Sequence, residues 1–296
     1  MWHRYKNGNY VVAINDTDGT KIRRTEDDEF CAEFPESMDI NITQKCNGCC
    51  PFCYAECTPD GRHGDIMGAK FIDTLKPYTE TALQVNDLSH PDLLPFLKKL
   101  KTLKVFPSIT VNQKHFEQKE DFIAQLINDK LIYGLGISLV NPTGEFIRKA
   151  QQYPNAVIHT INGITTPHDY IKLVDKNLKV LILGYKDKGR GHDYLVTNEE
   201  KVRYNQKWLY ENVSLMMKHN WYNVLSFDNL ALEQLKIKEQ ISPEDFDKFY
   251  QGEEGTCSMY VDLVDKTFGV SSLVPKKEML PLKDDVVEMF KVVKSL

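Results

Sequence analysis

Short apolar stretches alternate with amphipathic helical patterns along most of this chain, and this alternation limits the fold more than any other feature. Helical patterns lie between the stretches, such as the face formed by Leu93, Leu94, Leu97 and Leu100. Repeated strand–helix units predict a parallel sheet with right-handed crossovers. The expected strands are 38–42, 81–85, 108–111, 136–139, 156–161, 178–183 and 224–227.

The predicted fold class is therefore α/β, with the sheet either open and doubly wound or curled into a complete or partial barrel. In each case the chemistry is expected at the C-terminal ends of the strands. Two β-hairpins are expected outside this core, one near each end of the chain, because strand-forming residues flank turn residues over 10–24 and 259–270.

Composition narrows the class of protein. The 296 residues carry a net charge of −5, which argues against a dedicated duplex nucleic-acid-binding protein. No apolar stretch approaches the roughly 20 residues that a membrane span requires, and the first residues do not resemble a signal peptide. We expect a cytoplasmic protein, and in that reducing compartment clustered cysteines bind metals or catalyse reactions more often than they form disulfides.

Five of the seven cysteines fall between Cys46 and Cys57. A structural zinc site normally takes two separated cysteine pairs, but here the pairs adjoin at Cys49 and Cys50. A dithiol redox site would use two cysteines and leave three unexplained. The third interpretation is an iron–sulfur cluster, because three thiolates on one loop can hold three irons of a 4Fe–4S cube. Its ligands would be Cys46, Cys50 and Cys53.

The segment Cys46-Asn47-Gly48-Cys49-Cys50-Pro51-Phe52-Cys53 resembles the C-x-x-x-C-x-aromatic-C motif of the radical S-adenosylmethionine (radical SAM) superfamily. The resemblance covers about residues 36–230. It implies a partial (β/α)6 TIM-like barrel, a 4Fe–4S cluster and SAM as cofactors, and an electron donor such as a flavodoxin or ferredoxin as partner. It also implies reductive cleavage of SAM to a 5′-deoxyadenosyl radical that abstracts hydrogen from a substrate.

The same resemblance implies where SAM binds. The family has a Gly-Gly-Glu-type motif after the second strand, which hydrogen-bonds the methionine amino group, whereas this chain has Gln84-Val85-Asn86-Asp87. We expect Gln84, Asn86 or Asp87 to replace that contact. The other implied cofactor-binding residues are Phe52, Tyr54, Ser138, Asn162 and Gly184.

Three segments are expected: an N-terminal hairpin extension at 1–35, a core barrel at 36–230, and a C-terminal helical and hairpin extension at 231–296. The substrate is left open between a peptide, a nucleotide and a small metabolite. The charged, glycine-containing loop 186–192 is expected to be solvated or to bind an anionic group. The alternative function is a degenerate relative that keeps its cluster for structure or sensing.

Overall fold

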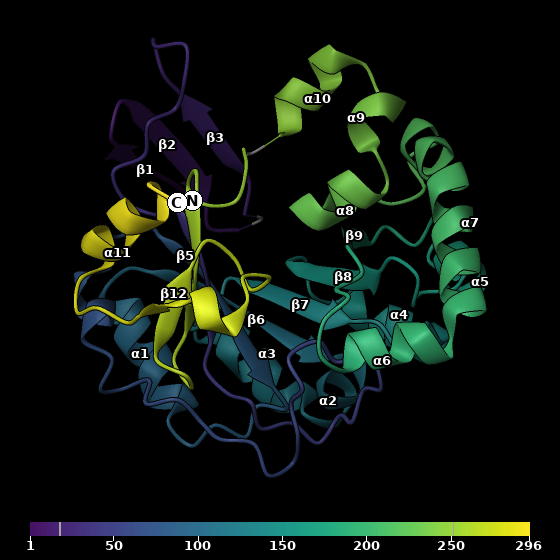
Figure 1. Cartoon of the computed structure of the whole chain (residues 1–296), viewed down its shortest axis with the longest axis horizontal. Helices are drawn as coiled ribbons and strands as arrows, with labels where there is room; N and C mark the ends of the chain where they lie inside the picture. Colours follow the sequence, from purple (N-terminus) through teal and green to yellow (C-terminus); the bar gives the residue numbers. More distant parts are fainter. Residues whose placement is uncertain (18, 251) are drawn as a thin grey trace.

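The computed structural model describes residues 1–17, 19–250 and 252–296. Its main feature is a ten-stranded sheet in the order β10-β9-β8-β7-β6-β5-β4-β11-β12-β13 (Figure 1). Seven consecutive strands of this sheet run parallel to one another. They are β4 (Ser37–Asn41), β5 (Glu80–Asn86), β6 (Phe106–Asn112), β7 (Gly134–Ser138), β8 (Ala156–Ile161), β9 (Lys179–Leu183) and β10 (Val224–Phe227).

Helices connect these strands and lie around the outside of the sheet in Figure 1. They include α1 (Leu93–Thr102), α2 (Gln113–Gln118), α3 (Glu120–Asn128), α4 (Gly144–Ala150), α5 (Pro167–Lys172), α6 (Arg190–Thr197) and α7 (Glu199–Lys218), with the short 3-10 helix η1 (Lys70–Thr74) before β5. The α/β prediction and its large, mostly parallel sheet are confirmed.

Side chains of several core strands alternate between a buried and a more open environment. On β4, Met38 and Ile40 are almost fully buried, while Asp39 between them is exposed to water. The buried set forms the apolar core under the helices, as the period of two in a strand requires. The opposite, inner face carries mostly small or polar side chains, which makes it unlike the packed interior of a closed barrel.

The C-terminal hairpin differs from the expectation. The antiparallel pair β11 (Ser258–Asp262) and β12 (Thr267–Gly269) does form, but β11 also pairs in parallel with β4 along its whole length. The hairpin is therefore part of the main sheet and does not lie outside it. Its buried Met259 and Val261 explain this, because they continue the apolar face of β4. The remaining C-terminal elements are α8 (Asn229–Gln234), α9 (Ile237–Gln240), α10 (Pro243–Phe249), η2 (Lys276–Glu278), β13 (Leu280–Pro281) and α11 (Val286–Val293).

The N-terminal segment forms a separate three-stranded antiparallel sheet. The expected hairpin corresponds to β2 (Tyr10–Asn15) and β3 (Lys21–Arg24), and β1 (Trp2–Asn7) was not anticipated. β1 is mostly exposed or half-buried and polar, so its sequence lacks a clear apolar alternation. In the part of the chain that the structure describes, no helix is long and apolar enough to cross a membrane.

Candidate functional site at the C-terminal edge of the sheet

The cysteine-rich loop leaves the C-terminal end of β4, where the sequence places it. A short bridge between Lys45 and Thr58 closes the loop at its base. Within that bridge the Cys46 N–H donates to the carbonyl oxygen of Thr58 at 2.8 Å. The loop is therefore anchored at both ends to the strand edge rather than hanging freely in solvent.

Two of the predicted ligands face each other across Gly48. A Cβ atom at Gly48 would lie 3.2 Å from Cys46 Sγ and 3.8 Å from Cys50 Sγ. The Gly48 N–H donates to Cys46 Sγ at 3.3 Å. The chain turns through a left-handed conformation at Cys49 (φ 51°), and Cys49 is exposed. The loop thus places the Cys46 and Cys50 thiols beside Gly48, whereas the Cys49 side chain is exposed to solvent.

Cys53 and Cys57 complete the group of thiols. The Cys57 thiol and the backbone N–H groups of Cys57 and Ala55 donate hydrogen bonds to Cys53, and Arg190 adds positive charge; these hold the pKa of Cys53 well below its ordinary value despite burial. Hydrogen bonding to Cys53 and burial raise the pKa of Cys57, which is 4% exposed. A lowered thiol pKa favours the thiolate, the form that binds metal.

Cys46 and Cys50 differ from Cys53. Burial raises the pKa of both thiols, and each is raised further by the negative charge that Cys53 would carry. Cys46 and Cys50 are therefore electrostatic neighbours of Cys53, and Cys49 acts on both in the same direction. A bound cation would reverse the effect, because it stabilises every thiolate that contacts it.

Asn86, a predicted SAM-binding residue, holds the cysteine loop. It lies at an irregularity in the pairing of β5 with β6 and has a left-handed backbone (φ 53°), which asparagine tolerates. Its amide nitrogen lies 3.0 Å from the carbonyl oxygens of both Thr43 and Lys45 and 3.4 Å from Cys57 Sγ. Gln84 in turn donates to Asn86 Oδ1 at 3.4 Å and to Cys57 Sγ at 3.7 Å.

Asp87 and His115 hold the other side of the loop. Asp87 accepts from the backbone N–H of Asn47 at 3.3 Å and of Ser89 at 3.1 Å. Burial opposes its ionisation, but these hydrogen bonds lower the pKa of Asp87 below its ordinary value. His115 on α2 is fully buried and pairs through Nε2 with Asn47 Oδ1. Asp87 and His115 therefore both fix Asn47, the residue directly after Cys46.

The loop 186–192 packs on the cysteine loop and is not simply solvated. Arg190 donates to the Cys57 carbonyl at 2.8 Å. The Lys186 ammonium lies 4.1 Å from the centre of the Tyr54 ring. The Phe52 ring meets Tyr194 of α6 edge to face, with centroids 5.8 Å apart. Two of the implied cofactor residues, Phe52 and Tyr54, thus lie between the cysteines and the loop that leads into α6.

The other three residues implied to bind SAM, which are Ser138, Asn162 and Gly184, do not all lie in the same environment. Ser138 lies on the inner face at the end of β7, half-buried and without a side-chain hydrogen bond to any described residue. Asn162 donates to Gln234 of α8 at 2.9 Å. Gly184 lies against the same helix, since a Cβ there would be 2.4 Å from Leu230 Cγ. The structure brings Gln84, Asn86 and Asp87 to the cysteines, while α8 engages Asn162 and Gly184.

The thiols do not form a preassembled site for a single metal ion. In the described ranges, no three His, Cys, Asp or Glu side chains converge as ligands of one metal ion. A 4Fe–4S cube does not require that convergence, because each thiolate binds a separate iron. A Cβ at Gly48 would contact Cys46 Sγ, Cys50 Sγ and the His115 ring, so glycine leaves a methyl-sized space beside two of the three predicted ligands.

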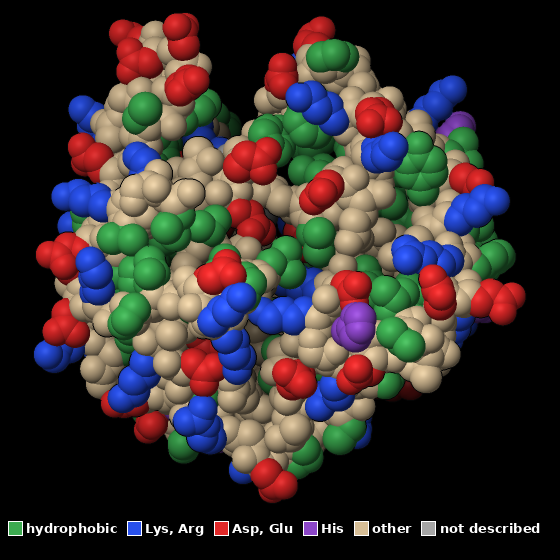
Figure 2. Space-filling model, in the orientation of Figure 1, with side chains coloured by type: hydrophobic (Ala, Val, Ile, Leu, Met, Phe, Trp, Pro, Cys, Tyr) green, Lys and Arg blue, Asp and Glu red, His purple; other side chains and the backbone are tan. Residues whose placement is uncertain are grey.

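The inner face beside the loop is open. Asp39 is in a strand paired on both sides, yet its side chain is exposed, so water must reach it from the inner face. Figure 2 shows a hollow near the middle of this side of the molecule, with acidic side chains (red) around it. On β8, burial lowers the pKa of His159 to about 4, which keeps this inner-face imidazole neutral at pH 7.

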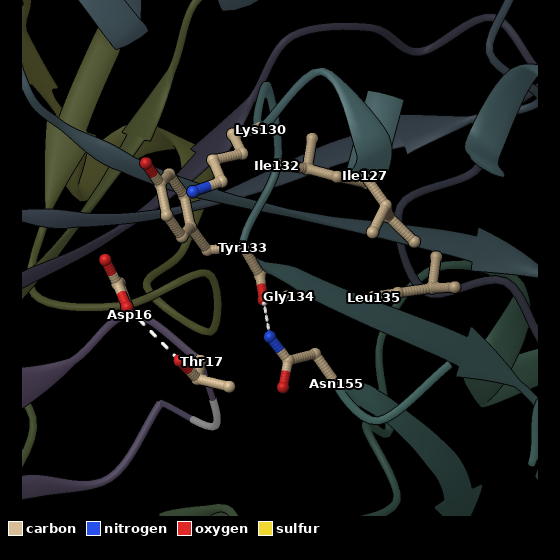
Figure 3. Close-up of a pocket in the computed structure, with 9 residues that line it drawn as sticks. All are labelled: Asp16, Thr17, Ile127, Lys130, Ile132, Tyr133, Gly134, Leu135 and Asn155. Atoms are coloured by element: carbon tan, nitrogen blue, oxygen red, sulfur yellow. Dashed lines mark hydrogen bonds between the residues drawn. The ribbon is translucent and has the colours of Figure 1, made fainter. Parts of the chain in front are cut away.

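Two cavities lie away from the thiols. One of about 220 Å³ is at the opposite end of the sheet, where Gly134 begins β7, and Figure 3 shows Asp16, Lys130 and Asn155 around it. The other, of about 490 Å³, is lined by α8, α10 and neighbouring loops. Parallel sheets bind ligands at the C-terminal ends of their strands, so the first cavity is not a candidate for the main site.

Sequence reasoning missed the residues that support the loop. Gly48 and His115 were not singled out, although Gly48 lies within the cysteine motif itself, and Arg190 was considered only as part of the solvated or anion-binding loop 186–192. Only the cysteine spacing marked this region, because His115 and Arg190 come from elements distant in sequence. Cys57 was not among the predicted ligands, and its contacts with Gln84, Asn86 and Cys53 place it inside the site.

Comparison with known proteins supports the fold. No protein-family model matches the sequence, and no curated protein matches it. Among solved structures, Streptococcus suis SuiB bound to S-adenosylmethionine is similar, with a TM-score of 0.61. The match covers 98% of this chain and 86% of the SuiB chain, at 12% sequence identity. At this identity the likeness establishes a shared fold alone.

Proposed function

We propose that this protein is a radical SAM enzyme that holds a 4Fe–4S cluster on Cys46, Cys50 and Cys53 and binds SAM beside it. The main sheet would be the partial barrel of such an enzyme, with its inner face as the reaction chamber. An electron donor such as a flavodoxin or ferredoxin would be its partner. When bound, the cluster and SAM supply an electron and a 5′-deoxyadenosyl radical that abstracts a hydrogen atom.

One observation carries the proposal: the cysteines of the motif lie at the C-terminal edge of the sheet, with Cys46 and Cys50 around the empty Cβ position of Gly48. The likeness of fold to SuiB, whose structure contains SAM, is independent support. The positive charge of Arg190 near Cys50 and Cys53 would offset the negative charge that three thiolates bring to a cluster.

The chain's own residues would orient SAM at the same edge. Asp87 keeps its carboxylate charged beside Asn47, one residue from Cys46, which suits recognition of the methionine ammonium group. Ser138 has its hydroxyl available on the inner face. We retain the proposed SAM contacts at Gln84, Asn86 and Tyr54, whereas Asn162 and Gly184 would contribute only if α8 moved, since that helix already engages both.

The test is to reconstitute the protein with iron and sulfide without oxygen, reduce it, and measure 5′-deoxyadenosine formed from SAM. We expect about four irons per chain and measurable 5′-deoxyadenosine. Changing Cys46, Cys50 or Cys53 to alanine should remove both. Cys49→Ala is the matched control, and it should retain both because Cys49 is exposed.

Two results would contradict the proposal. A protein that binds stoichiometric zinc and no iron–sulfur cluster would exclude it. A protein that binds the cluster but gives neither 5′-deoxyadenosine nor a SAM-dependent change in the cluster's electron paramagnetic resonance spectrum would instead support the degenerate relative.

A further inference from the structure

Asp39 is an isolated carboxylate inside the sheet. Aspartate is uncommon in strands, and this one lies in the middle of β4 with paired strands on both sides. It forms no hydrogen bond or ion pair with any residue that the structure describes, whereas Asp262 and Glu80 on adjacent strands are paired with Asn41 and Lys21. Because water reaches the side chain from the inner face, its charge needs no protein partner, and its two oxygens can accept hydrogen bonds from a ligand.

Small side chains leave room beside Asp39. In the register of the sheet, the row through Asp39 continues on successive strands as Ala82, Ser108 and Gly134. None of these side chains is charged or larger than a hydroxymethyl group. On the other side Tyr260 of β11 lies opposite Asp39 and closes the row. We call this space, bounded by Asp39, Ala82 and Ser108, the inner hollow.

The charges around the inner hollow favour a cation. The protein packed around β4 raises the pKa of Asp39 even though water reaches its side chain; among the charged groups Lys186 has the largest effect and lowers this pKa, and Glu254 and Asp228 raise it. The Lys186 ammonium is already engaged, with the Tyr54 ring and with Ser272 Oγ at 2.9 Å. Lys186 therefore has other contacts, and it forms no ion pair with Asp39 among the described residues.

The cavity under α8 and α10 extends this acidic surface. Three glutamates and one lysine, Lys238, line it together with apolar side chains. Two of its lining residues lie near the C-terminal ends of the strands. Leu230 packs against Gly184, which directly follows β9. Leu273 is next in sequence to Ser272, whose hydroxyl accepts a hydrogen bond from Lys186. The glutamates are Glu233, Glu253 and Glu254, and the apolar residues are Leu230, Leu232, Phe246, Tyr250 and Leu273.

We propose that the inner hollow is the substrate site, and that it selects a substrate with a primary amine on an apolar chain whose ammonium group pairs with Asp39. This inference rests on the proposed function, because it names the substrate class of that enzyme. The apolar part of the substrate would extend toward the cavity under α8. An ammonium paired with a carboxylate forms a charge-assisted hydrogen bond, which a neutral substrate cannot replace.

The test measures binding to the reconstituted protein with SAM by isothermal titration calorimetry. The probes are two pairs: the blocked peptide Leu-Lys-Leu against its norleucine analogue, and hexylamine against hexanol. We expect the charged member of at least one pair to bind ten times more tightly or better. A preference in the peptide pair alone indicates an amine carried by a peptide, and a preference in both indicates that a free amine suffices.

Asp39→Asn should reduce that preference to about one, and Asp39→Ser provides a second variant if the first folds poorly. Asp284→Asn is the control, because Asp284 is a highly exposed carboxylate paired with Lys70, and it should change nothing. Equal binding of charged and neutral probes to the wild type would overturn the inference. So would loss of the SAM-dependent resonance change in Asp39→Asn without any probe, since Asp39 would then belong to the SAM site.

The two proposals fail in different ways. If the wild type shows no SAM-dependent resonance change but still prefers the charged probes through Asp39, the proposed enzyme function fails and the amine site stands. If SAM is cleaved but no preference appears, the enzyme function stands and the amine site is wrong.

Discussion

At the scale of single residues, the cysteine loop depends on side chains that were expected to contact SAM. Asn86 donates toward two loop carbonyls and Cys57, so its amide stabilises the loop whether or not it also meets a cofactor. Its left-handed backbone aims the side chain back toward β4. The departure from a glycine motif at 84–87 thus has a structural explanation, because glycines there could not provide these hydrogen bonds.

The variant Asn86→Gly isolates this effect, since glycine accepts a φ of 53° without strain. Losing the amide contacts should lower the free energy of unfolding by about 1–3 kcal/mol and reduce the iron retained after reconstitution. Urea denaturation and iron analysis measure the two quantities. Asn220→Gly is the control, because Asn220 is also left-handed (φ 49°) but exposed. Equal effects in both variants would show that the amide contacts do not hold the loop.

At the scale of elements, the start of α6 is fitted to the cysteine loop. A Cβ at Gly191 would lie 2.4 Å from the Lys186 carbonyl oxygen and 3.6 Å from that of Phe52. Nearby, a Cβ at Gly189 would lie 2.7 Å from the Tyr54 carbonyl oxygen. Glycines in this loop therefore permit close contact between backbones, and the anion-binding role considered from sequence is not needed to explain them.

Gly191→Ala should displace the Lys186 carbonyl, and with it the loop that packs on the cysteine loop, and cost about 1–3 kcal/mol, the usual range for overpacking a tight site. The urea midpoint should fall, and the cluster should be lost faster on exposure to air. Gly144→Ala at the start of α4 is the matched control, since nothing lies within 4 Å of its Cβ position. A Gly191→Ala protein as stable as the control would mean that the backbones can separate without cost.

The elements also show what sequence could predict. All seven core strands were anticipated to within two residues, because their apolar runs are separated by helical patterns and turn residues. The pairing of β11 with β4 was not anticipated. The two strands are more than 200 residues apart, and nothing in the sequence of 258–262 indicates which strand it pairs with. In the site, the cysteine spacing was readable, whereas His115 and Arg190 were not, because tertiary packing alone brings them to the loop.

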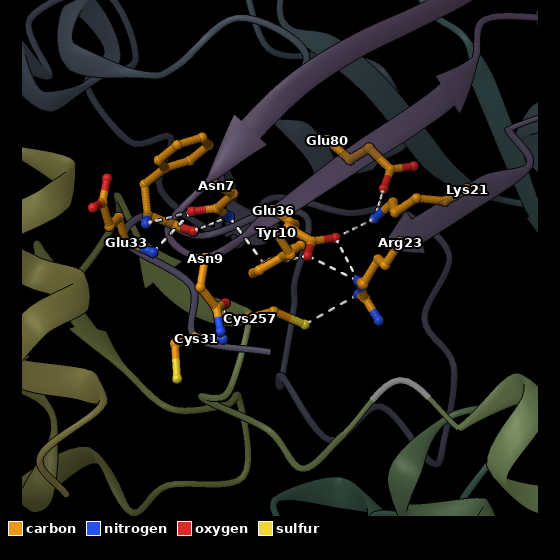
Figure 4. A network of polar contacts seen from close by, with 11 residues as sticks. Asn7, Asn9, Tyr10, Lys21, Arg23, Cys31, Glu33, Glu36, Glu80 and Cys257 are labelled. Carbon is orange, nitrogen blue, oxygen red and sulfur yellow. Dashed lines mark hydrogen bonds and ion pairs between the residues drawn. The ribbon is translucent and has the colours of Figure 1, made fainter. Parts of the chain in front are cut away.

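At the scale of the whole molecule, a buried ionic network joins the N-terminal sheet to the main sheet (Figure 4). Glu36, just before β4, is fully buried. Its carboxylate accepts from Arg23 Nε at 2.8 Å and from the Tyr10 hydroxyl, and Lys21 Nζ lies 3.4 Å away. Arg23 also donates to Cys257 Sγ at 3.3 Å, next to β11. The Glu36 carboxylate thus connects β2 and β3 to the start of β4, and Arg23 extends the network to Cys257, just before β11.

The last prediction concerns Glu36→Gln, which leaves Arg23 and Lys21 without their buried counter-charge. Breaking such a pair typically costs about 3–5 kcal/mol, so urea denaturation at pH 7 should show a loss of this size. Lys21 also pairs with Glu80, whose carboxylate is partly exposed. Glu80→Gln removes that carboxylate charge and should cost no more than about 1 kcal/mol. Equal losses of unfolding free energy in the two variants would show that the burial of Glu36 does not increase its contribution to stability.

The pH dependence of the same variant gives an independent check. Burial opposes ionisation of Glu36, but Lys21 and Arg23 outweigh it and lower its pKa below the ordinary value of 4.5. A carboxylate with a lowered folded-state pKa contributes its full stabilisation above the unfolded-state value and loses it as the pH falls through the folded-state value. The difference between wild type and Glu36→Gln should therefore be constant near pH 7 and shrink below pH 4.5. A difference that grows on acidification would mean that Glu36 is protonated in the folded protein, and that the two sheets are joined without its charge.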